Sequence, residues 1–385
     1  MQIIETAGLP IKSWCMEPEE GAVLQATHIA RLPFAHHHIA LMPDTHQGYG
    51  MPIGGVLAAV DAIIPNAVGV DIGCGMLACK TTLRDISKGD IKQIMGLLRK
   101  TIPVGFHHRK TPQDIPAPPE KAAVVKAEYE RARYQAGTLG GGNHFIEIQR
   151  GDDGHIWLMI HSGSRNLGKQ VCDHYNALAK RMNQRDPDVV PAKWDLAYLP
   201  ADTEEGAAYI AEMDYCQRFA AANRELMFVH MLDAFKEVMR GADVYGDAPI
   251  INVHHNYAGL EHHFGKDVWV HRKGAISAQA GEFGIIPGSQ GTKSYIVTGR
   301  GNPESFCSCS HGAGRRMGRK EARRTLSLTA EIARMDEQGI VHGIRGVRDL
   351  DEAAGAYKDI DLVMEEQRDL VKVEVELTPL GVMKA

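Results

Sequence analysis

The 385-residue sequence lacks a long hydrophobic run, a disulfide pattern and a low-complexity linker. The apolar stretch Pro52–Val60 is ended by Asp61 and is far too short to cross a bilayer. The seven cysteines, an odd number, follow no regular spacing, which predicts free or metal-bound thiols in a reducing compartment. Because the N-terminus has no basic segment followed by an apolar one, we expect no signal peptide and a cytoplasmic protein that does not associate with membranes.

Two common nucleotide-binding motifs are also missing, and charge of neither sign dominates. The sequence has no Gly-x-x-x-x-Gly-Lys-Ser/Thr loop and no Gly-x-Gly-x-x-Gly at a strand-to-helix turn, so any nucleotide is bound by another route. The net charge of −5, from 43 Lys+Arg against 48 Asp+Glu, excludes a nucleic-acid coat protein that is basic throughout. A local basic patch remains compatible with this balance.

The residues that are abundant indicate a globular α+β protein rich in glycine and histidine, with 40 glycines and 19 histidines. Apolar periodicity predicts four helices, at 85–100, 119–135, 168–181 and 203–240. Short β-like runs are predicted at 55–60, 76–81, 144–149, 156–160, 250–253, 268–272, 294–297 and 371–377. Because strands and helices do not alternate one for one, we expect a β-sheet core surrounded by helices rather than a doubly wound sheet. With no linker or repeat, residues 1–385 are predicted to form one large domain.

Glycine-rich segments carry most of the aspartate, cysteine and histidine that could perform chemistry. Asp71 and Cys74 lie three residues apart in one such turn, and His144, His161 and His255 each lie at an end of a predicted strand. A carboxylate, a thiolate and several imidazoles suit a divalent transition metal, Zn or Mn before Mg or Ca. The set is too large for a single tetrahedral ion, so we expect a pair of metals that share Cys74.

Other histidines are given weaker roles. Neighbouring residues on a strand point to opposite faces, so we expect only one of His254 and His255 to face the site. The run 36–38 and the pairs 107–108 and 262–263 have no glycine-rich context, which favours surface or supporting positions.

Basic residues are dense immediately after His311, and this favours phosphate-bearing substrates. They are Arg315, Arg316, Arg319, Lys320, Arg323 and Arg324. For Arg323 and Arg324 a solvated helix face is the competing interpretation. Composition and spacing alone therefore indicate a metal-dependent enzyme that acts on phosphate groups.

Seven motifs, in order along nearly the whole chain, resemble those of the RtcB family of RNA ligases, and of a compact bacterial branch within it. They are Asp71-Ile-Gly-Cys74, Asn143-His144-Phe-Ile-Glu147, His161-Ser-Gly-Ser-Arg165, His255-Asn256-Tyr257, Ser289 with Ser294-Tyr295, His311-Gly-Ala-Gly-Arg315 and Pro379-Leu-Gly-Val-Met-Lys384. Four positions depart from the family pattern, namely Asn166, Gln290, Lys293 and Gly318.

The resemblance implies a GTP- and Mn(II)-dependent ligase with two ions per active site. Such an enzyme joins an RNA 3′-phosphate or 2′,3′-cyclic phosphate to a 5′-hydroxyl, in RNA repair or tRNA splicing. His311 would be the nucleophile that forms a histidine–GMP intermediate, from which an activated RNA 3′-pp-5′-G end is made. We further expect a monomer, with an accessory activator protein as a candidate partner.

The resemblance also implies a role for each matching residue. Cys74 would bridge the ions, with His144 and His161 supporting them and Asp71 and His255 completing the shell of the second ion. Residues implied to bind GTP or guanylate are Asn143, Glu147, His255, Asn256, Ser289, Ser294, His311, Gly312, Gly314, Tyr357 and Lys384. Glu147 would accept from the guanine edge, and the implied catalytic arginines Arg165 and Arg315 would hold phosphates. Asp44 and His46 lie in a family motif and are expected to support the site from outside it.

Two other functions are compatible with parts of this pattern. A two-metal phosphodiesterase or phosphatase acting on RNA ends would use the same ligands with water as the nucleophile, but would leave Glu147, Tyr357 and Lys384 unexplained. A non-catalytic RNA-binding protein would need the metals only for its structure.

Overall fold

The structure, a computed structural model, describes residues 1–184, 189–240, 244–246 and 249–384. One of its two large sheets has six strands in the order β1-β2-β3-β4-β12-β11. These are β1 (Gln2–Ile4), β2 (Ile11–Ser13), β3 (Ala35–His46), β4 (Ile53–Ala59), β12 (Lys266–Lys273) and β11 (Asn256–His263). The β2–β3 pair is parallel and the other pairs are antiparallel.

The other large sheet has seven strands in the order β10-β6-β8-β7-β17-β15-β14, all antiparallel. They are β10 (Ile251–His254), β6 (Gly75–Lys80), β8 (Ile156–Ser162), β7 (Phe145–Gly151), β17 (Val371–Met383), β15 (Ser294–Gly299) and β14 (Phe283–Ile286). Two small sheets pair β5 (Ala62–Ile63) with β9 (Leu199–Pro200) and β13 (Ala275–Ser277) with β16 (Ser308–Ser310).

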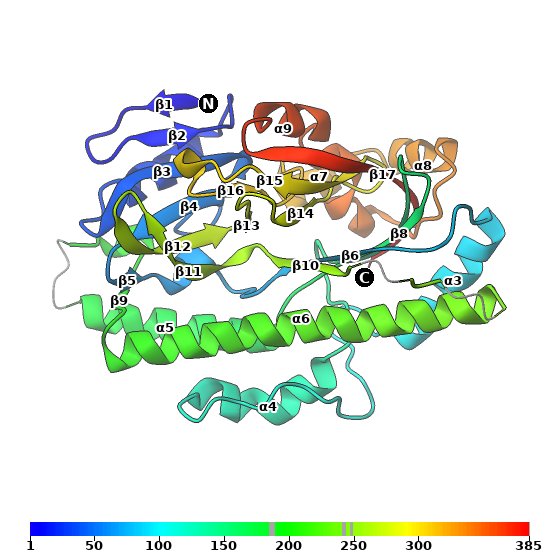
Figure 1. Ribbon diagram of the computed structural model, residues 1–385, viewed down its shortest axis with the longest axis horizontal. Coiled ribbons are helices and arrows are strands. Elements are labelled where there is room, and N and C mark those ends of the chain that lie inside the picture. The colour runs from blue at the N-terminus through cyan, green and yellow to red at the C-terminus, as the bar shows by residue number, and fades with distance from the viewer. Residues whose placement is uncertain (185–188, 241–243, 247–248, 385) are drawn as a thin grey trace.

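Helices surround the sheets, and the longest, α6 (Glu204–Val238), runs along the molecule beneath the strands, with α4 on its outer side (Figure 1). The Thr203 hydroxyl accepts a hydrogen bond from Gly206 N, which caps the start of α6. The other α-helices are α1 (Glu20–Ile29), α2 (Pro65–Val68), α3 (Lys88–Thr101), α4 (Ala123–Gln135), α5 (Arg165–Asn183), α7 (Arg319–Thr325), α8 (Leu328–Glu337) and α9 (Ile360–Glu366). The 3-10 helices are η1 (Ala192–Trp194), η2 (Pro303–Ser305), η3 (Val347–Glu352) and η4 (Ala354–Ala356).

Both faces of the seven-stranded sheet are buried. On one face, side chains from β7 and β8 such as Ile148 and Leu158 pack with Ile94 of α3 and Met231 of α6. Full burial of one such side chain stabilises the fold by about 1.5–3 kcal/mol. A second apolar cluster joins strands of both large sheets: Met42, Val56, Val270, Ile286 and Val297. The two sheets are therefore packed together, and this fixes the loops at their ends relative to one another.

The predicted α+β class and sheet core are confirmed. All four predicted helices and all eight predicted strands are present, with shifted ends, and the apolar stripe of α6 is buried at Tyr209, Met213 and Phe219. The predictions omitted the helices α1, α2, α7, α8 and α9 and the strands β1, β2, β3, β5, β9, β11, β13, β14 and β16. Strand β3 was missed because three consecutive histidines and Pro43 conceal its apolar pattern.

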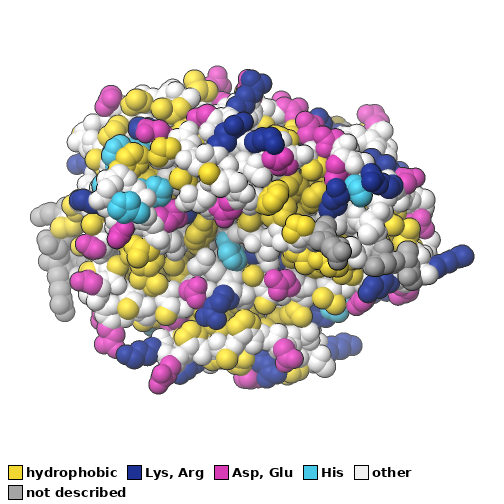
Figure 2. All heavy atoms as spheres, in the orientation of Figure 1, with side chains coloured by type: hydrophobic (Ala, Val, Ile, Leu, Met, Phe, Trp, Pro, Cys, Tyr) yellow, Lys and Arg dark blue, Asp and Glu magenta, His cyan; other side chains and the backbone are white. Residues whose placement is uncertain are grey.

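The surface carries charge of both signs. Acidic and basic side chains are interspersed over the face shown in Figure 2, as the small net charge leads one to expect. Among the described residues, no helix is long and apolar enough to cross a membrane.

Candidate active site

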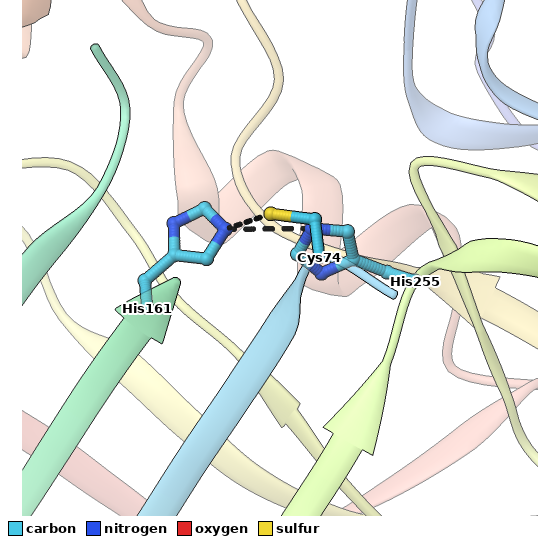
Figure 3. Close-up of side chains that lie close together, drawn as sticks. All are labelled: Cys74, His161 and His255. Atoms are coloured by element: carbon cyan, nitrogen blue, oxygen red, sulfur yellow. Dashed lines mark hydrogen bonds between the residues drawn. The ribbon is translucent and has the colours of Figure 1, made fainter. Parts of the chain in front are cut away.

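Three neighbouring strands of the seven-stranded sheet bring a thiol and two imidazoles together. Cys74 directly precedes β6, His161 lies near the end of β8, and His255 directly follows β10. Because β6 pairs with both of the other strands, these residues meet at one end of the sheet. Figure 3 shows the three side chains pointing toward one another. Cys74 Sγ lies 3.3 Å from His161 Nε2, which lies 3.4 Å from His255 Nε2.

A second group shares Cys74 and adds Asp71 and His144. His144 Nε2 lies 3.4 Å from Cys74 Sγ and 3.0 Å from Asp71 Oδ2. In each group of three residues the ligand atoms lie within 4.8 Å of one another, as ligands of one metal ion must. The arrangement agrees with two metals sharing Cys74. It differs from the predicted distribution of ligands, since Asp71 and His255 fall in different groups.

Hydrogen bonds fix the tautomers of two histidines in the form that binds a metal. Nδ1 of His144 donates to the Leu139 carbonyl at 2.9 Å, and Nδ1 of His161 donates to the Asn143 carbonyl at 3.2 Å. Each Nε2 therefore carries a lone pair, and both lone pairs face the Cys74 thiol. The single thiol proton of Cys74 can serve only one of these two acceptors, whereas a cation would bind both, so the donor set fits bound metal.

Burial favours the neutral form of two imidazoles of this centre, those of His161 and His255. It lowers the pKa of both His161 and His255 well below the ordinary value, and neighbouring histidines lower them further. Burial, with the nearby Asp71 carboxylate, raises the pKa of the Cys74 thiol. The thiol therefore keeps its proton in the absence of metal, and it would lose that proton when a cation binds beside it.

Gly163 leaves room for Asp71, because a Cβ there would lie 2.1 Å from Asp71 Oδ1.

His254 and His255 face opposite ways, as predicted. Nδ1 of His254 lies 3.1 Å from the Gly73 carbonyl and 3.2 Å from an Arg224 nitrogen, away from the metal groups. The other tandem histidines have supporting or surface positions. His38 is buried and donates to the Glu304 carbonyl, His262 pairs with Asp267 on the surface, and His107 is exposed.

His311 lies beside the metal groups, with its ring centroid 4.8 Å from that of His255. Its Nδ1 donates to Asp44 Oδ2 at 2.6 Å, and the same oxygen accepts the His311 backbone N–H at 3.1 Å. The Nε2 lone pair of His311 is therefore free to attack an electrophile.

Gly314, with φ of +71°, packs against Asp44, and a Cβ there would lie 2.3 Å from the Asp44 carbonyl oxygen.

A cavity opens beside His311, and it collects most of the residues predicted to bind guanylate. Those that line it are Asn143, Glu147, Ser289, His311, Gly312, Gly314, Tyr357 and Lys384. Arg315, predicted to hold phosphates, and His46, expected to support the site, line it as well. Four further lining residues had no predicted role in guanylate binding: Phe145, Gln290, Arg319 and Glu352. The ionisable side chains of Glu147, Arg315, Arg319, Glu352 and Lys384 line the cavity together with apolar ones such as Ile53, Phe145 and Pro287.

Four of the residues predicted to bind guanylate or phosphate lie outside this lining. Ser294 Oγ accepts from Gln149 Nε2 and Gly288 N, behind the wall of the cavity. Asn256 donates to the Asp71 carbonyl and accepts from Gly274 N, and so ties the turn of Asp71 to the turn of Gly274. Arg165 donates to Thr138 Oγ1 and the Gly105 carbonyl, and His255 belongs to the metal groups.

Glu147 is one of two buried carboxyl groups that line the cavity. Burial raises its pKa to about 8, against the opposing effects of Lys384 and of the Gln149 hydrogen bond. Gln149 Nε2 donates to Glu147 Oε2 at 2.6 Å. The group is thus oriented, and once it has lost its proton it would accept from the N–H donors of a ligand.

Sequence reasoning missed the contribution of two acidic residues. Asp44 was expected only to support the site, yet it orients His311 directly. Glu352 gave no signal, because no glycine-rich turn or metal-ligand spacing surrounds it. Its position is determined by tertiary packing of η3 against α7, which single-sequence patterns do not report.

The fold and the site together describe an α+β protein in which two candidate metal-binding groups share Cys74 and lie next to a cavity lined by ionisable side chains. Residues 25–121 and 114–385 match the family model described as tRNA-splicing ligase RtcB, and the chain belongs to this family. It is 40% identical to an RNA-splicing ligase RtcB1 of Escherichia coli, with 97% of this chain and 96% of that protein covered. It is 32% identical to a tRNA-splicing ligase RtcB of Thermococcus kodakarensis, with 94% and 90% covered.

Proposed function

We propose that this protein is a GTP- and Mn(II)-dependent RNA ligase that joins 3′-phosphate or 2′,3′-cyclic phosphate ends to 5′-hydroxyl ends. The observation that carries the proposal is the position of His311. Its Nδ1 is held by Asp44, which leaves Nε2 as the free nitrogen, and the residue lies between the metal groups and the cavity. The names of the relatives, RNA-splicing and tRNA-splicing ligases, support the same reaction class.

The proposed chemistry proceeds by two transfers of guanylate and one of RNA. His311 Nε2 attacks the α-phosphorus of GTP, a P–N bond forms and pyrophosphate leaves. An RNA 3′-phosphate oxygen then takes the guanylate from histidine, which gives RNA 3′-pp-5′-G. Finally the 5′-hydroxyl attacks the RNA 3′-phosphorus, loses its proton and displaces GMP. A 2′,3′-cyclic end must first be opened by water to a 3′-phosphate.

Two Mn(II) ions would be held by the groups Cys74, His161, His255 and Asp71, Cys74, His144. When bound, such ions neutralise charge on phosphoryl groups and lower the pKa of an attacking hydroxyl. Arg315, which lines the cavity, would bind phosphates there. Arg165, which donates to the Gly105 carbonyl, would also hold phosphates. Glu147 would accept N–H groups of guanine, with Asn143, Ser289 and Tyr357 around it. Ser294 and Asn256 would act from behind the cavity wall.

We also propose that residues 1–385 form one catalytic domain that works as a cytoplasmic monomer, in RNA repair or tRNA splicing. The seven cysteines are free and buried, which supports a reducing compartment. An accessory activator protein stays a proposed partner. Ala385 lies outside the described residues.

Joining of two defined oligonucleotides tests the proposal. An RNA with a 3′-phosphate and an RNA with a 5′-hydroxyl are incubated with the protein and GTP, after chelation and again after Mn(II) is restored. We expect a joined product only with Mn(II) and GTP. Removal of the 3′-phosphate without joining would instead favour a two-metal phosphatase. Joining that proceeds equally well without Mn(II) would contradict the mechanism.

A further inference from the structure

A single buried carboxylate connects the cationic side chains of the cavity. Glu352, 4% exposed at the end of η3, accepts from Arg319 Nε at 2.9 Å and Arg315 Nη1 at 3.3 Å through Oε1. Its other oxygen, Oε2, accepts from the Tyr357 hydroxyl and pairs with Lys384 Nζ at 3.5 Å. These partners come from separate parts of the chain, so Glu352 ties together three segments of the cavity wall.

The carboxylate is ionised in this environment. Burial opposes ionisation, but Lys384, Arg319, the Tyr357 hydrogen bond and Arg315 hold the pKa of Glu352 at about 2. Three cationic side chains around one anion leave an excess of positive charge, which suits a polyanionic ligand such as a triphosphate. The backbone is fixed too, because the Glu352 carbonyl accepts from Gln290 Nε2 at 2.8 Å.

Lys384 lies where two carboxyl groups compete for it. Lys384 and Glu147 line the same cavity, and the charges of Glu147 and Glu352 both act on the lysine. Its ion pair is with Glu352, and its ammonium lies 5.9 Å from the centre of the Phe145 ring. Glu147 meanwhile bonds Gln149, so its remaining acceptors are not occupied by the lysine.

We propose that Glu352 is a positioning residue for nucleotide recognition, which holds Arg315, Arg319 and Lys384 in place and keeps Lys384 from pairing with Glu147. The inference rests on the proposed function in that the cavity must bind GTP. Without the Glu352 charge, the cations repel one another and Lys384 turns to the remaining carboxyl group. It then competes with guanine for Glu147, so both affinity and the preference for guanine fall.

Equilibrium binding of GTP and of ATP, measured by calorimetry on the full-length protein, tests this role separately from ligation. Glu352→Gln keeps the size of the side chain and removes its charge. We expect GTP to bind about tenfold more weakly and the GTP-to-ATP affinity ratio to fall at least about threefold. Glu365→Gln is the matched control, because the Glu365 carboxylate pairs with the exposed Arg368 and does not line the cavity, and the binding of this variant should equal that of the unmodified protein.

A double-mutant cycle with Lys384→Met distinguishes positioning from general support of the fold. If Glu352 acts through Lys384, adding Glu352→Gln to Lys384→Met changes the GTP-to-ATP ratio by less than about twofold. Additive effects, or a Glu352→Gln protein that binds both nucleotides like the unmodified one, would overturn the inference. So would an unmodified protein that binds no GTP. Binding of GTP without RNA joining would instead reject the proposed function and leave the role of Glu352 standing.

Discussion

His311 and Asp44 are 267 positions apart in the chain, yet Nδ1 of the histidine donates to the carboxylate at 2.6 Å. The same Asp44 oxygen accepts the His311 backbone N–H, so Asp44 holds both the ring and the backbone of this residue. This pair fixes both the tautomer and the direction of the proposed nucleophile, in the way that a buried aspartate orients a catalytic histidine in other nucleophilic enzymes.

Asp44→Asn should therefore impair the nucleophile while leaving the fold intact. The amide can donate to Nδ1, which favours the tautomer with its proton on Nε2, where attack must occur. We expect the rate of guanylate transfer to His311 to fall at least about a hundredfold, with bound metal unchanged. Single-turnover labelling with GTP measures the rate. A rate within about threefold of the unmodified protein would show that Asp44 does not orient the histidine.

Gly314→Ala tests the backbone contact that supports the same pair. A Cβ at this positive-φ position would meet the Asp44 carbonyl oxygen at 2.3 Å, so Asp44 or the His311 loop must move. We expect a loss of about 1–3 kcal/mol in the free energy of unfolding and a loss of guanylate transfer. Gly318→Ala is the matched control, since a Cβ there has nothing within 4 Å. Equal effects of the two substitutions would argue against a specific contact.

Metal content should depend on which group of ligands is changed. His255→Ala and Asp71→Ala should each remove one of two Mn(II) ions, whereas Cys74→Ala should weaken both, because Cys74 belongs to both groups. Cys79→Ala, which changes another buried thiol on β6, should retain both ions. Elemental analysis after dialysis gives the stoichiometry. The shared-ligand arrangement fails if Cys74→Ala and Asp71→Ala lose the same amount of metal.

Glu147 should make the stability of the ligand-free protein depend on pH. Burial raises its pKa from 4.5 to about 8. The unfolded chain loses this proton near pH 4.5 and the folded protein keeps it until about pH 8, so the free energy of unfolding falls as pH rises across that interval. Glu147→Gln removes this dependence. Relative to the unmodified protein, its Tm should be similar at pH 5 and higher by about 3 °C or more at pH 8. A difference in Tm that stays constant with pH would contradict a protonated Glu147.

Much of the fold and site could be predicted because local signals report local structure. The Thr203 cap and apolar stripe predicted α6, and glycine-rich turns with Asp71, Cys74 and His161 indicated a metal centre shared through the thiol. The alternation of side chains along a strand correctly separated His254 from His255.

The remainder depends on contacts between distant segments. No spacing in the sequence relates Asp44 to His311, or Glu352 to Lys384, since sheet packing brings them together. The division of ligands between two groups also follows from the meeting of three strands, so the sequence could not tell that Asp71 and His255 lie in different groups.

Transfer of guanylate to His311 is the measurement that tests the central claim most directly. The protein is incubated with [α-32P]GTP and Mn(II) and then separated by denaturing electrophoresis. We predict a covalent label that is labile in acid and stable in alkali, as a phosphoramidate is, and that disappears in His311→Ala. A protein that takes up no label, or a His311→Ala variant that is labelled like the unmodified protein, would contradict the account.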